Sequence, residues 1–180
     1  VVSNAGVTSP APLKDLSIAR WDKLMNVNTR ATLSLAQAAY PALKESRGAL
    51  VAVASMSGMG AHPGMGAYSP SKAALISLCQ VLAQEWACDG INVNTVSPGM
   101  IRTPLTQQVY ENNKIAKERA ALVPWGRVGH PEDISNVISF LLSPEADYIT
   151  GQNILIDGGF VDSLYSHIPG LPDSSQIDKN

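Results

Sequence analysis

The chain is 180 residues long and 45% hydrophobic, with a formal net charge of −2 at pH 7. These values predict one globular domain and give no reason to expect a nucleic-acid or membrane-surface partner. No apolar run reaches the ~18 residues that a membrane span needs, and none resembles a signal peptide, so a cytoplasmic protein is expected.

Strand and helix patterns alternate along the chain. A strand is expected at Val1 and Val2, then a long helix over residues 17 to 44 that Pro41 should kink or end. Three more strands are GALVAVA, INVNTVS and QNILID, with helices over residues 67 to 87 and from Pro131 onward. Residues 101 to 127 have the composition of a polar, mobile segment. The tail from residue 160 shows no periodicity, and we expect residues 172 to 180 to be frayed.

Strands separated by helices of this length predict an α/β fold with a parallel sheet covered on both faces. The two cysteines, Cys79 and Cys88, lie nine residues apart around one apolar helix. This placement favours two buried thiols and argues against a disulfide or a metal site.

The stretch SMSGMGAHPGMGAYSPSK, residues 55 to 72, gathers a hydroxyl, a phenol and an ammonium. Ser55 ends an apolar strand, while Tyr68 and Lys72 lie one turn apart on the next helix. Ligands bind at such strand ends in open α/β sheets. An ammonium ~5 Å away would lower the tyrosine pKa by roughly two units. Tyr68 is therefore a candidate general acid and base, and Ser55 a candidate donor to the substrate oxygen.

The spacing of tyrosine and lysine is not specific by itself, because two other tyrosines also have a lysine four residues later. The three pairs are Tyr40/Lys44, Tyr68/Lys72 and Tyr110/Lys114. Tyr40 lies near an expected helix end, and Tyr110 lies in QQVYENNKIAKERA, which is typical of a solvated face. Both are interpreted as structural. Tyr68 opens a helix of small and apolar residues, which favours the catalytic interpretation.

Further motifs follow one another in a characteristic order: SNAG, MNVNTR, the serine before a glycine-rich loop, YSPSK, SPGMIRTPL and TGQNILIDGG. With this order and spacing, residues 1 to 160 closely resemble the short-chain dehydrogenases/reductases. The resemblance implies a Rossmann-type doubly wound parallel sheet, with residues 161 to 180 as a carboxyl-terminal tail. It also implies an oxidoreductase that uses NADP or NAD to interconvert a small secondary alcohol and a ketone. The implied catalytic tetrad is Asn28, Ser55, Tyr68 and Lys72.

The resemblance further implies cofactor-binding residues, which are Asn4, Gly6, Tyr68, Lys72, Pro98, Gly99, Ile101 and Thr103. Asn28 would hold a water that links Lys72 to solvent, and Lys72 would also bond the nicotinamide ribose. Gly6 and Gly99 allow a backbone to approach a ligand closely, and Thr103 offers a hydroxyl and a backbone N–H. Taken singly, the glycines would be ordinary turns, Thr103 a helix cap and Asn28 a satisfied helix kink.

One departure from the family pattern limits this interpretation. The phosphate-binding loop G-x-x-x-G-x-G is absent, and Val1 falls within what the resemblance makes the fourth strand. The expectation is the carboxyl-terminal part of a longer enzyme whose preference for NAD or NADP cannot be read. The alternative is a non-catalytic fragment or binding subunit that cannot hold a dinucleotide. A T-G-x-x-x-G-x-G loop encoded about eighty residues before Asn4 would favour the enzyme.

The substrate pocket is expected near residues 59 to 65 and after Thr103. Its apolar members would be Leu105, Val109, Ile115, Leu122 and Trp125, which favour a medium-sized, partly apolar alcohol or ketone. His62 lies in the loop before Tyr68 and could contact the substrate, although a loop histidine is more often merely solvated. The two long helices carry more small and apolar surface than one sheet face uses. In the family such helices pair across a two-fold axis, so the resemblance implies a homodimer or homotetramer.

Overall fold

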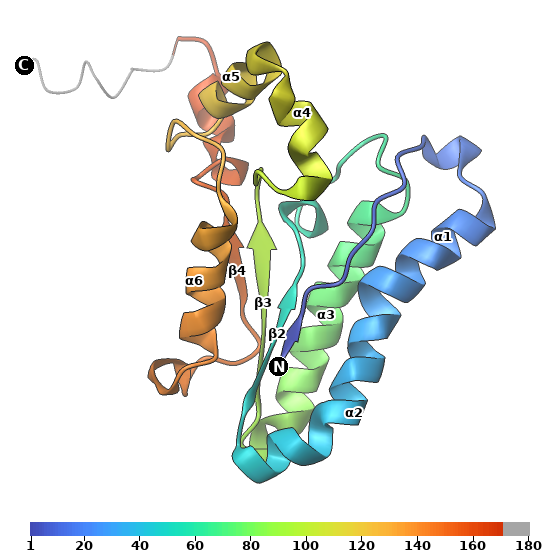
Figure 1. The fold of residues 1–180 in the computed structure, drawn as a ribbon, viewed down its shortest axis with the longest axis vertical. Helices are drawn as coiled ribbons and strands as arrows, with labels where there is room; N and C mark the ends of the chain where they lie inside the picture. Colours follow the sequence, from blue (N-terminus) through green and yellow to red (C-terminus); the bar gives the residue numbers. More distant parts are fainter. Residues whose placement is uncertain (171–180) are drawn as a thin grey trace, which may run out of the picture.

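A computed structural model describes residues 1 to 170, in which a parallel sheet carries helices on both faces (Figure 1). Its strands are Val2–Ser3 (β1), Ala49–Val53 (β2), Asn92–Pro98 (β3) and Asn153–Ile156 (β4). They lie in the order β1-β2-β3-β4, and each is parallel to its neighbour. The expected Rossmann-type parallel sheet is confirmed.

Alternate residues of β2 enter two separate cores, one on each face of the sheet. Leu50 and Ala52 pack with helices α2 (Ala31–Ser46) and α3 (Tyr68–Trp86). Val51 and Val53 face the other way and pack with helix α6 (Pro131–Leu141). Because successive side chains of a strand point to opposite faces, a strand covered on both sides reads as the continuous apolar run seen in the sequence.

The long helix expected over residues 17 to 44 is interrupted. It consists of α1 (Ile18–Met25), a π-helical turn (Asn26–Arg30) and α2. Pro41, expected to kink or end this helix, lies inside α2 and does not end it. Proline removes one backbone hydrogen bond. The helix nevertheless continues to Ser46 because Leu43, beyond the proline, is buried in the core next to α3.

The segment from 101 to 127 is more ordered than its composition predicts. It contains α4 (Gln107–Glu111) and α5 (Asn113–Ala121), which Asn112 caps by accepting from two backbone N–H groups. The tail is also helical over Val161–His167, although its sequence shows no periodicity. Other short 3-10 turns are Leu13–Asp15, Met56–Gly58, Ala87–Asp89, Pro104–Thr106 and Pro144–Ala146. The fraying expected for residues 172 to 180 lies outside the described residues.

Within residues 1 to 170, no helix is long and apolar enough to cross a membrane. The same part of the chain holds no group of three metal-ligating side chains close together. Cys79 is buried, whereas Cys88 is exposed on the turn after α3. The expectation of two buried thiols is therefore wrong for Cys88, because the helix ends just before it.

Gly58 sets how closely the loop after β2 approaches α3. A Cβ atom at this position would lie 2.8 Å from the backbone carbon of Lys72 and 3.0 Å from its carbonyl oxygen. We expect Gly58→Ala to lower the free energy of unfolding by about 1–3 kcal/mol, because neither backbone can yield easily. Gly60→Ala is the control, since nothing lies within 4 Å of its Cβ position. Urea titration checks the difference, and equal stability of the two variants would contradict it.

Candidate active site

The carboxyl ends of three strands meet the start of α3 at one edge of the sheet (Figure 1). A cavity of about 300 Å³ opens there. Nearly all of the predicted site residues line it: Asn4, Gly6, Ser55, Tyr68, Lys72, Pro98, Gly99, Ile101 and Thr103. Residues far apart in the sequence are thus brought to one place by the parallel topology. Asn28, the remaining predicted residue, does not line the cavity.

Tyr68 is the first residue of α3 and is half-buried. Burial raises the pKa of its phenol, and a hydrogen bond with the Ser55 side chain opposes that rise. Ser55 caps the turn after β2, where its hydroxyl accepts from the backbone N–H of Ser57 at 3.1 Å. This bond orients the Ser55 hydroxyl, which is also hydrogen-bonded to the Tyr68 phenol. The two hydroxyl groups that could donate to a substrate carbonyl oxygen therefore lie side by side in the cavity wall.

Lys72 is almost fully buried, with 3% of its surface exposed. Its ammonium donates to the Val53 carbonyl at 2.7 Å and lies 5.9 Å from the centre of the Tyr68 ring. Burial lowers the pKa of Lys72 to about 8. The expected lowering of the Tyr68 pKa by this ammonium is therefore wrong in direction. The cost of burying a phenolate dominates, and the ammonium is directed at a backbone carbonyl.

Asn28 lies in the π-helical turn between α1 and α2 and is fully buried. Its amide oxygen accepts from Val7 N–H at 2.8 Å, and its amide nitrogen donates to the Val7 carbonyl and to the Ser71 hydroxyl. The side chain therefore ties the turn after β1 to α3 from behind the cavity. These bonds fit the ordinary alternative of a satisfied helix kink, and the expected role in holding a water that links Lys72 to solvent stays a prediction. Turns of the π-helical type are common at functional sites.

The two glycines of the predicted cofactor set, Gly6 and Gly99, have different surroundings. A Cβ on Gly6 would be in ordinary van der Waals contact with the Lys72 ammonium, at 3.4 Å, so the backbone of Gly6 lies close to this group at the cavity wall. A Cβ on Gly99 would collide with the Cβ of Asp157, just after β4. Gly99 is thus required by packing between strand ends, and its expected role in the close approach of a ligand stays a prediction.

Thr103 combines both of the interpretations that its sequence position allowed. Its backbone N–H donates to the Thr106 hydroxyl at 2.9 Å, and the two threonines form a capping box at Pro104–Thr106. Thr103 also lines the cavity. The cap therefore fixes this residue at the cavity wall.

The three tyrosine and lysine pairs differ in their surroundings. The Lys44 ammonium lies 5.9 Å from the Tyr40 ring, the same distance as in the Tyr68 pair. Tyr40, however, donates to the Asp89 carboxylate and packs on Trp86, away from the cavity. The same lysine distance thus occurs in a purely structural cluster.

Tyr110 does not lie on a solvated face, contrary to expectation. Only 4% of its surface is exposed, because α4 folds over the strand ends and places the ring in the cavity wall. The guanidinium groups of Arg102 and Arg119 lie 5.4 and 5.6 Å from its ring centre. Lys114 points instead toward Glu118, at 4.0 Å.

A second cavity of about 360 Å³ adjoins the first. Five residues line both: Met56, Ser57, His62, Met100 and Arg119. Sequence reasoning indicated the loop that carries His62, which does line both cavities, but it gave no signal for Arg119. Of the apolar residues expected in the pocket, Leu105 lines the first cavity and Leu122 the second, whereas Val109, Ile115 and Trp125 line neither.

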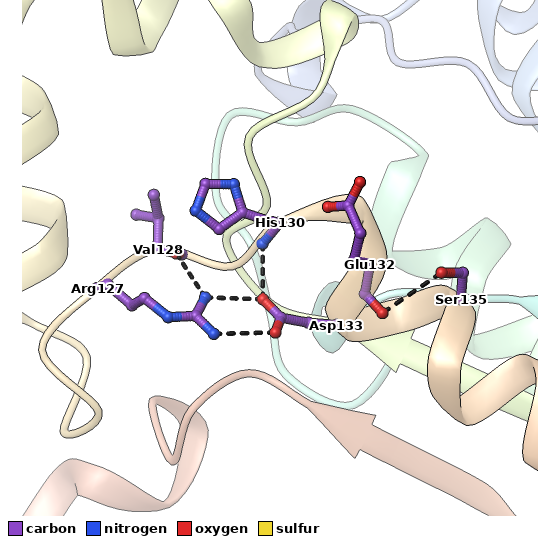
Figure 2. Close-up of polar contacts among 6 residues, drawn as sticks. All are labelled: Arg127, Val128, His130, Glu132, Asp133 and Ser135. Atoms are coloured by element: carbon purple, nitrogen blue, oxygen red, sulfur yellow. Dashed lines mark hydrogen bonds and ion pairs between the residues drawn. The ribbon is translucent and has the colours of Figure 1, made fainter.

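An ion pair between Arg127 and Asp133 lies at the start of α6 (Figure 2). Arg127 donates to both carboxylate oxygens of Asp133, at 2.7 and 2.9 Å, and the backbone N–H of His130 donates to the same carboxylate. These bonds hold the pKa of Asp133 well below its usual range, with Arg127 as the main cause. In the loop that these bonds hold, the Gly129 carbonyl accepts from the backbone N–H of Arg102 at 2.9 Å. Arg102 lies between two predicted cofactor residues, Ile101 and Thr103.

Comparison with known proteins agrees with this architecture. A family model described as "Enoyl-(Acyl carrier protein) reductase" matches residues 1–161. This chain belongs to the short-chain dehydrogenase/reductase family.

Among curated relatives, the 3-oxoacyl-acyl-carrier-protein reductase FabG of Thermotoga maritima is 40% identical over 163 residues. The match covers 89% of this chain and 65% of that relative, so the chain spans about two thirds of the relative's length. A solved structure from Agrobacterium tumefaciens, assigned as a 2-deoxy-d-gluconate 3-dehydrogenase with bound NADP, superposes with a TM-score of 0.84 and 34% identity. That superposition covers 89% of this chain and 66% of the other. A 4-hydroxyisoleucine dehydrogenase mutant complexed with NADH and succinate gives the same TM-score at 36% identity, with coverage of 89% and 67%.

Proposed function

We propose that this chain is the catalytic part of an oxidoreductase that uses NADP or NAD to interconvert a secondary alcohol and a ketone. The observation that carries the proposal is the single cavity that holds Ser55, Tyr68 and Lys72 together with the predicted cofactor residues. The bound NADP and NADH in the similar structures support the same choice of cofactor. Residues 1 to 160 form the domain that carries this activity, and residues 161 to 180 form the tail.

The cavity fits the nicotinamide end of a dinucleotide. Its wall offers the backbone of Gly6 and Gly99, the threonine hydroxyl of Thr103 and the buried ammonium of Lys72, which are suitable partners for ribose hydroxyls, amides and phosphates. When bound, the dinucleotide supplies or accepts the hydride. Asn4, Pro98 and Ile101 complete this wall, and Asn28 acts behind it by holding the turn after β1.

In the proposed reaction Tyr68 transfers the proton. Its raised pKa keeps the phenol protonated at neutral pH, which is the form that gives a proton to a carbonyl oxygen as hydride arrives. Ser55 donates to the same oxygen as negative charge develops there. Lys72 supplies positive charge nearby, and its pKa of about 8 allows it to replenish the proton near neutral pH. These roles favour the reduction of a ketone.

The substrate does not follow from the relatives, because their names cover several chemistries, from acyl-carrier-protein thioesters to a hydroxylated amino acid. The direct test is spectrophotometric: the purified protein with NADPH or NADH is offered a panel of ketones and secondary alcohols. Dinucleotide binding is followed separately by nicotinamide fluorescence. Binding and turnover are expected, and a protein that neither binds the dinucleotide nor turns over would contradict the proposal.

We also propose that the protein forms a homodimer through α2 and α3, or a homotetramer that uses β4 and the DGG turn after it as a second interface. Both helices keep apolar surface outside the core, with Leu35 38% and Val81 51% exposed. Leu78, in contrast, packs against the core, so a charge there would disturb folding. We therefore expect Val81→Glu to shift the assembly toward the monomer while the fold is kept. Light scattering at micromolar concentration measures this, and a monomeric parent protein would refute the proposal. A cytoplasmic location stays a prediction.

A further inference from the structure

Arg119, on α5, is half-buried and lies in the wall shared by the two cavities. A guanidinium has five N–H donors. Among residues 1 to 170, none of those of Arg119 is used in a hydrogen bond, and the ion pairs of that region involve Lys44, Lys114 and Arg127 instead. A partly buried charge without a partner is costly in the protein alone. Arg119 therefore has the properties of a residue that awaits an anionic ligand.

The charges around Arg119 all have the same sign. The walls of the two cavities contain no aspartate or glutamate. The other lysine or arginine side chain there is Lys72, in the first cavity, and His62 borders both. In a partly enclosed site such charges reinforce one another, so an anionic molecule is attracted and a cationic one is excluded.

Tyr110 holds the guanidinium in place. Its ring centre lies 5.6 Å from Arg119, and such stacking removes much of the freedom of a long side chain. The Tyr110 hydroxyl is buried and has no hydrogen-bond partner within the described residues, although the residue lines the first cavity. The guanidinium stacked on the Tyr110 ring is therefore a fixed group of N–H donors that an anion in the cavity can meet.

The position of Arg119 indicates whether the anionic group belongs to the cofactor or to the substrate. The predicted cofactor residues Asn4, Gly6 and Thr103 line the first cavity but not the second. Arg119 borders both cavities, and the remaining wall of the second is mostly apolar and includes Leu122 and Phe160. A molecule that reaches both the Tyr68 phenol and this second cavity is the substrate. A single guanidinium on an otherwise apolar wall suits a monoanion such as a carboxylate better than a phosphate dianion.

We propose that Arg119 binds a carboxylate of the substrate, which is therefore an oxo acid or a hydroxy acid. The reacting carbonyl lies at Ser55 and Tyr68, and the acid lies at Arg119. This proposal rests on the proposed function above, because it concerns the substrate of the same site.

The test compares two oxo acids, acetoacetate and levulinate, with their methyl esters, which have the same carbon skeleton but no charge. Both pairs are reduced with NADPH by the parent protein and by Arg119→Gln. Arg102→Gln is the matched control. Its guanidinium lies at the same Tyr110 ring, at 5.4 Å, but it lines neither of the two cavities.

Loss of a charge-assisted bond should raise KM for the acids by about 10–100-fold in Arg119→Gln. We expect the esters, the affinity for NADPH and all parameters of Arg102→Gln to stay within a few-fold of the parent. Equal effects on acids and esters would overturn the proposal, as would no effect at all. Weaker NADPH binding with an unchanged preference for acids would also overturn it, because the anion would then be a cofactor phosphate.

Where the parent protein reduces neither the acids nor the esters, ligand binding decides this inference alone, while the proposed function is decided by its own test with the wider panel and the dinucleotide. Calorimetric titration with levulinate should give binding to the parent and to Arg102→Gln, and a loss of about 10-fold or more in Arg119→Gln. Equal binding by all three proteins, or no binding by the parent, would overturn the proposal.

Discussion

Replacing Tyr68 by phenylalanine is expected to lower kcat by about 10²–10⁴-fold, because only the group that carries the proton is removed. The ring stays at the start of α3, and its half-buried packing stays as it is. Cofactor affinity should therefore change little. Steady-state oxidation of NADPH with a ketone measures the loss of turnover, and fluorescence titration measures the affinity.

Tyr40→Phe is the matched control for this variant. Tyr40 has a lysine at the same 5.9 Å from its ring, but its hydroxyl bonds Asp89 away from the cavity. Turnover of Tyr40→Phe should stay within a few-fold of the parent at a temperature where both are folded. Residual activity of Tyr68→Phe above roughly one per cent would argue against the catalytic role. So would a similar loss in Tyr40→Phe, because the lysine spacing alone would then explain it.

Lys72→Met should make the protein more stable at pH 7 while it abolishes turnover. Burial lowers the pKa of Lys72 from 10.5 to about 8, and each pKa unit corresponds to about 1.4 kcal/mol, so the buried charge costs ~3 kcal/mol. Losing the bond to the Val53 carbonyl offsets about 1 kcal/mol of that gain. A net gain of about 2 kcal/mol in the free energy of unfolding is expected from urea titration at pH 7.

The sign of the pH dependence gives an independent check. Between about pH 8 and 10.5 the unfolded chain keeps a proton on Lys72 that the folded protein has lost. The free energy of unfolding of the parent should therefore rise with pH in this window, and this rise should be missing in Lys72→Met. Lys44→Met should not be stabilised, since Asp89 raises the pKa of Lys44. A less stable Lys72→Met at pH 7 would show that the bond to Val53 outweighs the cost of burial.

Much of the fold is local in origin and could therefore be predicted. The apolar run of β2 predicts a strand buried on both faces, and α3 was predicted over residues 67 to 87 against an observed Tyr68–Trp86. The exceptions are places where packing overrides local preference. Pro41 stays within α2 because Leu43 is buried beyond it, and α4 and α5 form in a segment whose polar composition predicts none.

The predicted site residues follow from motifs, because the catalytic groups lie at strand ends and helix starts that the sequence pattern marks. Parallel topology then brings Ser55, Tyr68 and Lys72 to one cavity, as expected. The electrostatics could not be predicted in the same way. The expected lowering of the Tyr68 pKa assumed a facing ammonium, whereas burial raises that pKa and Lys72 bonds a backbone carbonyl. The direction of such a shift depends on burial, which is a property of the whole fold.

Local motifs and periodicity are enough to indicate the family, the alternation of strands and helices along the chain, and the residues that meet at the carboxyl edge of the sheet. What surrounds these residues depends on contacts that form only in the folded protein. It placed Tyr110 in the cavity wall and Arg119 beside it, although their segment is polar in sequence. The physical reason is that a helix folding back over the strand ends makes contacts between residues far apart in the chain, and no local pattern records which of its faces will be covered.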